Sequence, residues 1–269
     1  MQSLTRLIIA FVACSVLALT TFAGPEAIPQ RDSKDKEVVA PAPSCDYSWT
    51  GFYIGVNVGY GWGDAATHFE PLPSATSFIN LDPTTRQPDP AGIFGGGQLG
   101  YNFQLGKFVL GAEADFQGSD MEGTEKTSPI VQFIGAPNNP GTFLEAHEKT
   151  DWFGTFRFRV GFTPFCRLLV YGTGGLAYGN VNYSATTDFT TNRGPIYHSS
   201  FDNTKVGWTA GGGLEYALTH RWSVKVEYLY YDLGDESSTA NASDGRPFQV
   251  RYNWETTANT VKGGLNFKF

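Results

Sequence analysis

The clearest structural signal in this chain is GFYIGVNVGYGW, residues 51–62. Its large apolar side chains stand at every second position, and the residues between them are mostly glycine. Successive side chains of a β-strand point to opposite faces, so this spacing collects the apolar groups on one face. The stretch therefore predicts a strand with one apolar face and one small or polar face.

The same alternation recurs in seven further segments. Each has apolar or aromatic residues at alternate positions with small or polar residues between them. The eight predicted strands cover residues 51–62, 92–105, 108–118, 151–162, 168–178, 205–216, 222–232 and 256–269.

The connections between these segments alternate in length. Long, polar connections cover residues 63–91, 119–150, 179–204 and 233–255, and tight ones cover 106–107, 163–167 and 217–221. Short periplasmic turns alternating with longer outer loops are typical of transmembrane β-barrels, and closure leaves no unpaired strand edge in lipid. We expect an all-β protein, namely an eight-stranded antiparallel transmembrane β-barrel with long outer loops and short periplasmic turns.

Composition agrees with a barrel that has an apolar surface. Among 269 residues, charged residues make up 17% and aromatic residues 15%, and there are 32 glycines. Ordinary soluble domains carry about 25% charged residues. The formal net charge of −7 argues against a nucleic-acid binder, which needs a basic surface.

The polar face of the predicted strands carries charges of both signs. These residues are Glu113, Asp115, Arg157, Arg159, Glu215, Lys225, Glu227, Lys262 and Lys268. On a soluble lipocalin-type barrel they would face solvent, whereas inside a narrow membrane barrel they must pair, because unpaired buried charges are prohibitive. Aromatic residues near strand ends, such as Trp62, Trp152 and Trp222, favour the membrane barrel, where they form interfacial girdles. We therefore predict an interior charge network.

The N-terminal part predicts a targeting segment and a tether. Residues 1–23 show the charged, apolar and small-residue order of a signal peptide, and the apolar run is shorter than the ~20 residues of a membrane anchor. Residues 24–48 are Pro-rich and lack hydrophobic periodicity, as expected of a periplasmic tether. The barrel is expected to cover residues 49–269.

Two cysteines would remain after signal cleavage. Cys45 precedes the first strand and Cys166 lies in a tight turn, so both are expected on the oxidising periplasmic side. They form a candidate disulfide, and the alternative is two unrelated free thiols.

The sequence gives no catalytic constellation, and we expect no enzyme. The histidines do not stand at strand ends beside a serine and an acid, and paired-Cys zinc motifs and phosphate loops are absent from the sequence. The glycines of residues 211–213 belong to a strand, where glycine leaves room for neighbours. No metal site and no catalytic residue are predicted.

Haem is the one cofactor for which candidate ligands exist. His68, His147 and His198 each fall in a different predicted loop, with Tyr197 beside His198. Imidazole and tyrosine are axial ligands of haem iron, and loops on a rigid barrel carry recognition. The alternative is that separate loops do not converge and that the histidines are ordinary polar residues.

Several stretches resemble a known family: residues 49–55, 95–102, 170–178 and 206–216, together with the terminal Phe269. They are similar to the alphaproteobacterial outer-membrane immunogenic and porin-like protein family, which has haemin-binding and major surface-antigen members. The resemblance covers residues 49–269 and implies location in the cell outer membrane. The terminal Phe resembles the signal read by the barrel assembly machinery.

The resemblance implies a structural, surface-exposed barrel that supports envelope integrity and contact with the host or environment. A haemin-binding receptor or adhesin is the alternative. A narrow porin is the second alternative: eight strands leave little interior room, but glycines at many inward positions would leave space for a thin water path. Expected partners are outer-membrane lipid, the assembly machinery, and haem or host surface molecules, without nucleic acid.

Overall fold

The computed structural model describes residues 46–72, 80–81, 85–127, 131–132, 143–188 and 195–269. The chain divides into two units, Met1–Ser44 and Cys45–Phe269, and all described residues belong to the second. The predicted signal peptide and most of the predicted tether thus lie outside the described residues. No helix in the described part is long and apolar enough to cross a membrane.

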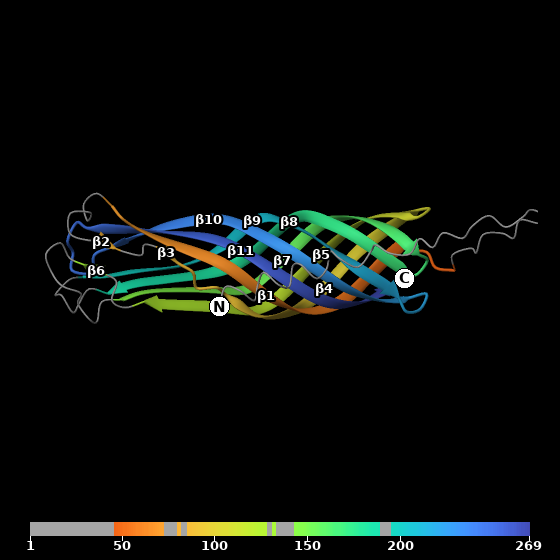
Figure 1. Cartoon of the computed structure of the whole chain (residues 1–269), viewed down its shortest axis with the longest axis horizontal. Coiled ribbons are helices and arrows are strands. Elements are labelled where there is room, and N and C mark those ends of the chain that lie inside the picture. The colour runs from red at the N-terminus through yellow and green to blue at the C-terminus, as the bar shows by residue number, and fades with distance from the viewer. Residues whose placement is uncertain (1–45, 73–79, 82–84, 128–130, 133–142, 189–194) are drawn as a thin grey trace, which may run out of the picture. The chain divides into compact units, whose positions relative to one another are not determined.

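Eight long strands close into one antiparallel ring (Figure 1). They are β1 (Gly51–Pro71), β4 (Ala91–Leu105), β5 (Phe108–Thr127), β7 (Phe143–Phe165), β8 (Leu168–Asp188), β9 (Ile196–Ala217), β10 (Trp222–Asn241) and β11 (Gln249–Lys268). Each pairs with its neighbour in sequence, and β11 pairs with β1 to close the ring. Three short strands, β2 (Asn80–Leu81), β3 (Thr85–Arg86) and β6 (Val131–Gln132), lie in the long connections. The predicted eight-stranded antiparallel barrel is confirmed.

The predicted long loops are wrong over much of their length, because most strands continue into them. β7 has 23 residues and β8 has 21, whereas a strand needs only about 9–11 residues to span a membrane. The sequence did not predict these parts of the strands, because their polar residues face outward and their apolar residues face inward. This is the reverse of the arrangement in the predicted strands.

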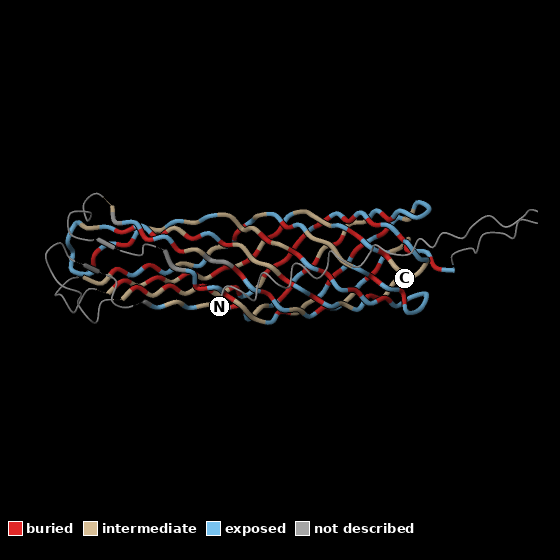
Figure 2. Tube along the Cα trace, in the orientation of Figure 1, coloured by how far each residue is buried: buried red, intermediate tan, exposed pale blue. Residues whose placement is uncertain are grey.

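The reversal is clearest on β8. Val170 and Leu176 point outward in its first half, whereas Asn180 and Asn182 point outward in its second half. Tyr183, in the same second half, is buried inside. The buried residues of β8 are odd-numbered in both halves, and buried residues recur along the length of the barrel (Figure 2). In β8 the apolar face therefore moves from the outside to the inside while the alternation is kept.

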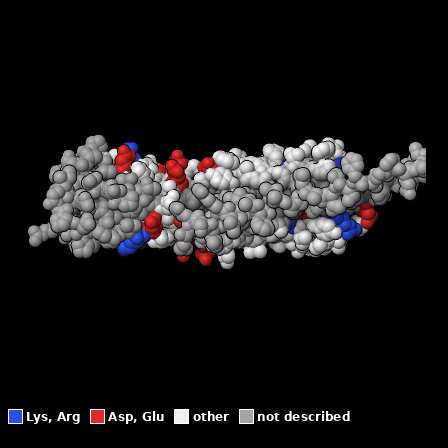
Figure 3. All heavy atoms as spheres, in the orientation of Figure 1, with Lys and Arg blue, Asp and Glu red and all other residues white. Residues whose placement is uncertain are grey.

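We call the strand parts with the polar outer face the extension and the remaining strand parts the membrane barrel. The extension comprises residues 66–71, 123–127, 143–150, 181–188, 196–204, 236–241 and 249–255. On the membrane barrel, Phe52, Val58 and Phe158 are each more than 60% exposed, as lipid-facing residues would be. Figure 3 shows acidic side chains on the extension and mostly uncharged surface along the membrane barrel.

Irregular pairing marks the junction between the two parts. Register shifts occur at Gly118/Met121 in β5, Thr150/Trp152 in β7 and Asp232/Asp235 in β10. A β-bulge adds a residue to one strand and re-aims the side chains that follow. In β7 the buried positions are even-numbered up to Thr150 and, apart from Gly154, odd-numbered from Phe153. The extra residue therefore changes which positions face inward in β7 and β10, whereas β8 keeps odd-numbered buried positions in both parts.

Candidate functional site

Arg157 is the centre of a charge network inside the membrane barrel. Its Nη2 lies 2.6 Å from Glu113 Oε1 and 3.0 Å from Asp115 Oδ2, and its Nη1 lies 3.0 Å from Glu227 Oε1. The pairing of β5 with β7 sets Glu113 directly opposite Arg157, so register alone brings the first of these pairs together. One guanidinium thus joins carboxylates from two sides of the lumen.

Arg159 extends the network toward the tight turns. Its Nη2 lies 2.7 Å from Glu215 Oε2, and its Nη1 donates to Tyr53 Oη at 2.8 Å. Tyr53 in turn donates to Glu113 Oε2 at 2.7 Å. The guanidinium also lies 3.9 Å from the centroid of the Tyr171 ring, a cation–π contact. Tyr53 and Arg159 therefore connect the carboxylate of Glu113 to the carboxylate of Glu215.

Two lysines complete the network. Lys225 Nζ lies 2.7 Å from Glu113 Oε1, and Lys262 Nζ lies 2.7 Å from Asp115 Oδ2 and 3.2 Å from Glu227 Oε2. The network then has four acids and four bases, a formal charge of zero, and each member is at most 4% exposed. Its members are Glu113, Asp115, Arg157, Arg159, Glu215, Lys225, Glu227 and Lys262.

The structure does not bring the ninth predicted member, Lys268, into the network. It is the last residue of β11, and its ammonium donates to the Ser48 carbonyl and lies 4.2 Å from the Tyr47 ring centroid. Its strand position places it at the rim of the barrel, beyond the carboxylates.

A plug of apolar residues closes the lumen beside that rim. Trp49 is 1% exposed, its backbone N–H donates to Gln104 Oε1 at 2.8 Å, and Tyr47 packs edge-on against it. The buried cluster comprises Tyr47, Trp49, Val109, Leu169, Tyr171 and Ala217. Tyr47 falls within the predicted tether, although two aromatic residues directly before the first strand are a signal for a buried segment.

Two further apolar clusters cross the lumen beyond the charges. The nearer comprises Phe94, Met121, Phe153, Ala177, Leu229 and Tyr231. The outer one, within the extension, comprises Phe69, Leu144, Val181, Tyr183, Ala185, Tyr197, Ala240, Ala242, Val250, Tyr252 and Trp254. With the plug, buried apolar side chains thus lie at three levels of the lumen.

Inward glycines make room for these side chains. A Cβ at Gly213 would stand 2.7 Å from the Tyr171 hydroxyl, and one at Gly161 would stand 2.6 Å from Leu169 Cδ1. Real Cβ atoms essentially never come this close to another heavy atom. The space that the missing side chains leave is therefore filled by aromatic and aliphatic neighbours.

The predicted haem ligands lie on strands of the extension and do not converge. His68, His147 and His198 are on the outer faces of β1, β7 and β9, and Tyr197 points inward and is buried. β8 separates β7 from β9, and β1 is three strands from each. Neighbouring strand residues point to opposite faces, so Tyr197 and His198 cannot share a ligand. Within the described residues no group of three His, Cys, Asp or Glu is suited to a metal.

The predicted cysteine pair is described on one side only. Cys166 lies in the turn between β7 and β8, and Cys45 lies outside the described residues. The next residues are close, since Asp46 Oδ2 is 3.5 Å from Arg167 Nη2. The chain that follows Cys45 therefore runs beside the turn that holds Cys166, and the disulfide stays a prediction.

Known proteins resemble this chain along most of its length. The outer membrane protein beta-barrel domain family matches residues 15–269. The chain belongs to this family. The 31 kDa outer-membrane immunogenic protein of Brucella melitensis is 40% identical over 85% of this chain and 87% of its own length. The 22 kDa outer membrane protein of Rhizobium leguminosarum is 30% identical over 82% of this chain and 79% of its own.

Among solved structures, the outer membrane protease OmpT of Escherichia coli aligns with 84% of this chain and 99% of its own, with a TM-score of 0.46 and 10% identity. The protease activity in that name belongs to that protein.

Membership of the outer membrane protein beta-barrel domain family places the chain in the outer membrane. In such barrels the tight turns are periplasmic and the longer connections face outward. The plug therefore lies at the periplasmic rim, and the extension projects from the cell.

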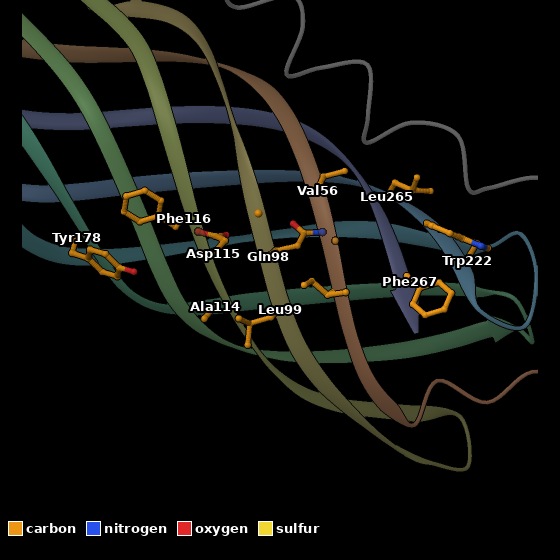
Figure 4. Close-up of a pocket in the computed structure, with 13 residues that line it drawn as sticks. Val56, Gln98, Leu99, Ala114, Asp115, Phe116, Tyr178, Trp222, Leu265 and Phe267 are labelled. Carbon is orange, nitrogen blue, oxygen red and sulfur yellow. The ribbon is translucent and has the colours of Figure 1, made fainter. Parts of the chain in front are cut away.

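A groove of about 770 Å³ lies on the outer wall of the membrane barrel. Figure 4 shows Val56, Leu99 and Phe116 among its lining residues, with Leu265 and Phe267 farther along. Val56, Leu99, Phe116 and Leu265 are exposed on the outer wall, and Phe267 is half-buried. The groove therefore suits acyl chains of the membrane rather than a solute in the lumen.

Proposed function

We propose that this chain is a structural, surface-exposed outer-membrane barrel that supports envelope integrity and presents its extension to the host or environment. The observation that carries the proposal is the filled lumen. Three apolar clusters and a neutral charge network occupy an interior that eight strands make just wide enough for side chains. These features favour a structural barrel with a filled interior over a narrow porin.

The proposal assigns no catalytic role. The lumenal carboxylates of the membrane barrel already have cationic partners within 4.0 Å, as with Glu215 and Arg159. The histidines of the extension point outward from separate strands, which leaves neither a general base beside a nucleophile nor a set of haem ligands.

We further propose that Cys45 and Cys166 form a disulfide that fixes the tether to the periplasmic rim. The contact between Asp46 and Arg167 supports it, because each of these residues is the immediate neighbour of one cysteine. The burial of Tyr47 and Trp49 also holds the chain at the rim, so the disulfide would close an already ordered approach.

Deletion of the gene tests the structural role against the porin role. Loss of a structural barrel should raise sensitivity to detergent and to large antibiotics, with uptake of small sugars unchanged. Complementation with the wild-type gene should restore resistance. Reduced uptake of small solutes with normal detergent resistance would instead support a porin.

A further inference from the structure

The junction between the membrane barrel and the extension contains a small cavity with a mostly apolar lining. Its volume is about 30 Å³, which is room for a water molecule or two. Met121, Phe153 and Leu233 form part of its lining, and the polar residues beside them include Glu148 and Tyr231. The register shifts of β7 and β10 lie at the same level, so the cavity lies where regular pairing is interrupted.

Glu148 differs from the carboxylates of the charge network. It is 1% exposed, and its Oε2 has no hydrogen-bond partner among the described residues; the Tyr231 hydroxyl at the same cavity also lacks one. Glu113 and Glu227 each have three cations within 4.0 Å, whereas no ion pair within that distance reaches Glu148 in the described part of the chain. This carboxyl is therefore buried without a direct countercharge.

The ionisable groups around Glu148 do not supply this missing countercharge. Lys205 of β9 donates to the Gly234 carbonyl at 2.9 Å and lies 5.3 Å from the Tyr183 ring. Glu236 of β10 accepts from Asn203, and Glu125 of β5 accepts from the Gln87 backbone. Tyr183 of β8 and Tyr231 of β10 are neutral phenols at ordinary pH.

Burial disfavours the charged form of such a carboxyl. Burial raises the pKa of Glu148 to about 8, and attraction to Lys205 opposes the rise only in part. The cavity is too small to hold the water molecules that would hydrate an ionised carboxylate. Glu148 therefore ionises most easily when the surrounding strands open locally and water enters.

We propose that Glu148 makes the inner end of the extension sensitive to pH: the strands around it stay packed when Glu148 is protonated and open locally when it is ionised. When the strands around it open locally, Glu148 is hydrated and has its ordinary pKa of 4.5. When they are packed, its pKa is about 8. Between these values the open form loses a proton that the closed form retains. Opening is therefore favoured as pH rises through that window, and the effect levels off above about 8.

Hydrogen exchange on the refolded chain in phospholipid nanodiscs tests whether ionisation of Glu148 opens the surrounding strands. Protection factors of the backbone amides of residues 144–150 and 250–254, corrected for intrinsic exchange, should fall about tenfold per pH unit from about 5 to 8 and then level off. Glu148→Gln should remove this slope and keep the amides protected. The matched control, Glu255→Gln, removes an exposed outward carboxyl of β11 and should leave the slope unchanged.

Lys205→Met gives a second, directional test. Removing this cation should move the levelling-off to higher pH, because Lys205 lowers the pKa of Glu148. Wild-type protection that is flat between pH 5 and 8, or a slope that persists in Glu148→Gln, would overturn the proposal.

Discussion

Single residues of the lumen differ in how well their charge is compensated. Arg157 faces three carboxylates in the membrane barrel, whereas Glu148 of the extension has no direct ion pair among the described residues. Buried ion pairs tolerate loss of a partner poorly, because the remaining charge is left without compensation. We therefore expect loss of a charge of the network to destabilise the barrel, and loss of the Glu148 carboxyl to change its dependence on pH.

Reversal of the central charge should destabilise the barrel severely. Arg157→Glu places a fourth carboxylate among Glu113, Asp115 and Glu227, and we expect a loss of at least about 3–5 kcal/mol in the free energy of unfolding. The control is Arg251→Glu, an exposed residue 3.9 Å from Glu70, which should cost less than about 1 kcal/mol. Urea unfolding in lipid vesicles measures both, and equal losses would contradict the inward position of Arg157.

The cysteines make a prediction that needs no mutation. Labelling of the denatured, unreduced mature chain with a maleimide should find no free thiol, and prior reduction should expose two. Two labelled cysteines without reduction would rule out the disulfide between Cys45 and Cys166.

At the scale of elements, strands change their environment partway along their length. β8 presents Val170 and Leu176 to lipid and then Asn180 and Asn182 to the exterior, with no break in its register against β9. The outer cluster of the lumen then supplies the extension with a core of its own. The extension is thus a water-exposed continuation of the barrel strands with a buried core of its own.

Adjacent residues of β8 test this arrangement. Tyr183→Asp would bury a carboxylate in the outer aromatic cluster and should make the extension sensitive to added protease, while the membrane barrel stays protected. Ser184→Asp, one position away on the outer face, should behave as wild type. Equal protease sensitivity of the two variants would argue against the reversal of faces.

At the scale of the whole molecule, alternation made the ring of eight strands predictable, because lipid outside and small or paired groups inside give a period-two signal. The charge network was predictable because both signs stood on the polar face. The extension was not, since its outward Asn, Ser and Thr residues look like loop composition when the inward aromatic residues are not read with them. The Tyr47 and Trp49 plug depends on tertiary packing that strand periodicity does not report.

Single-channel recording tests the central claim, that the lumen is filled, most directly. Refolded wild-type barrel inserted in a planar bilayer should give no steady conductance above that of the empty bilayer, because three apolar clusters and a neutral, fully buried charge network occupy the interior. Insertion is verified on the same preparation by the shift in gel mobility on heating. A stable, ohmic open level in the wild-type protein would contradict the closed barrel.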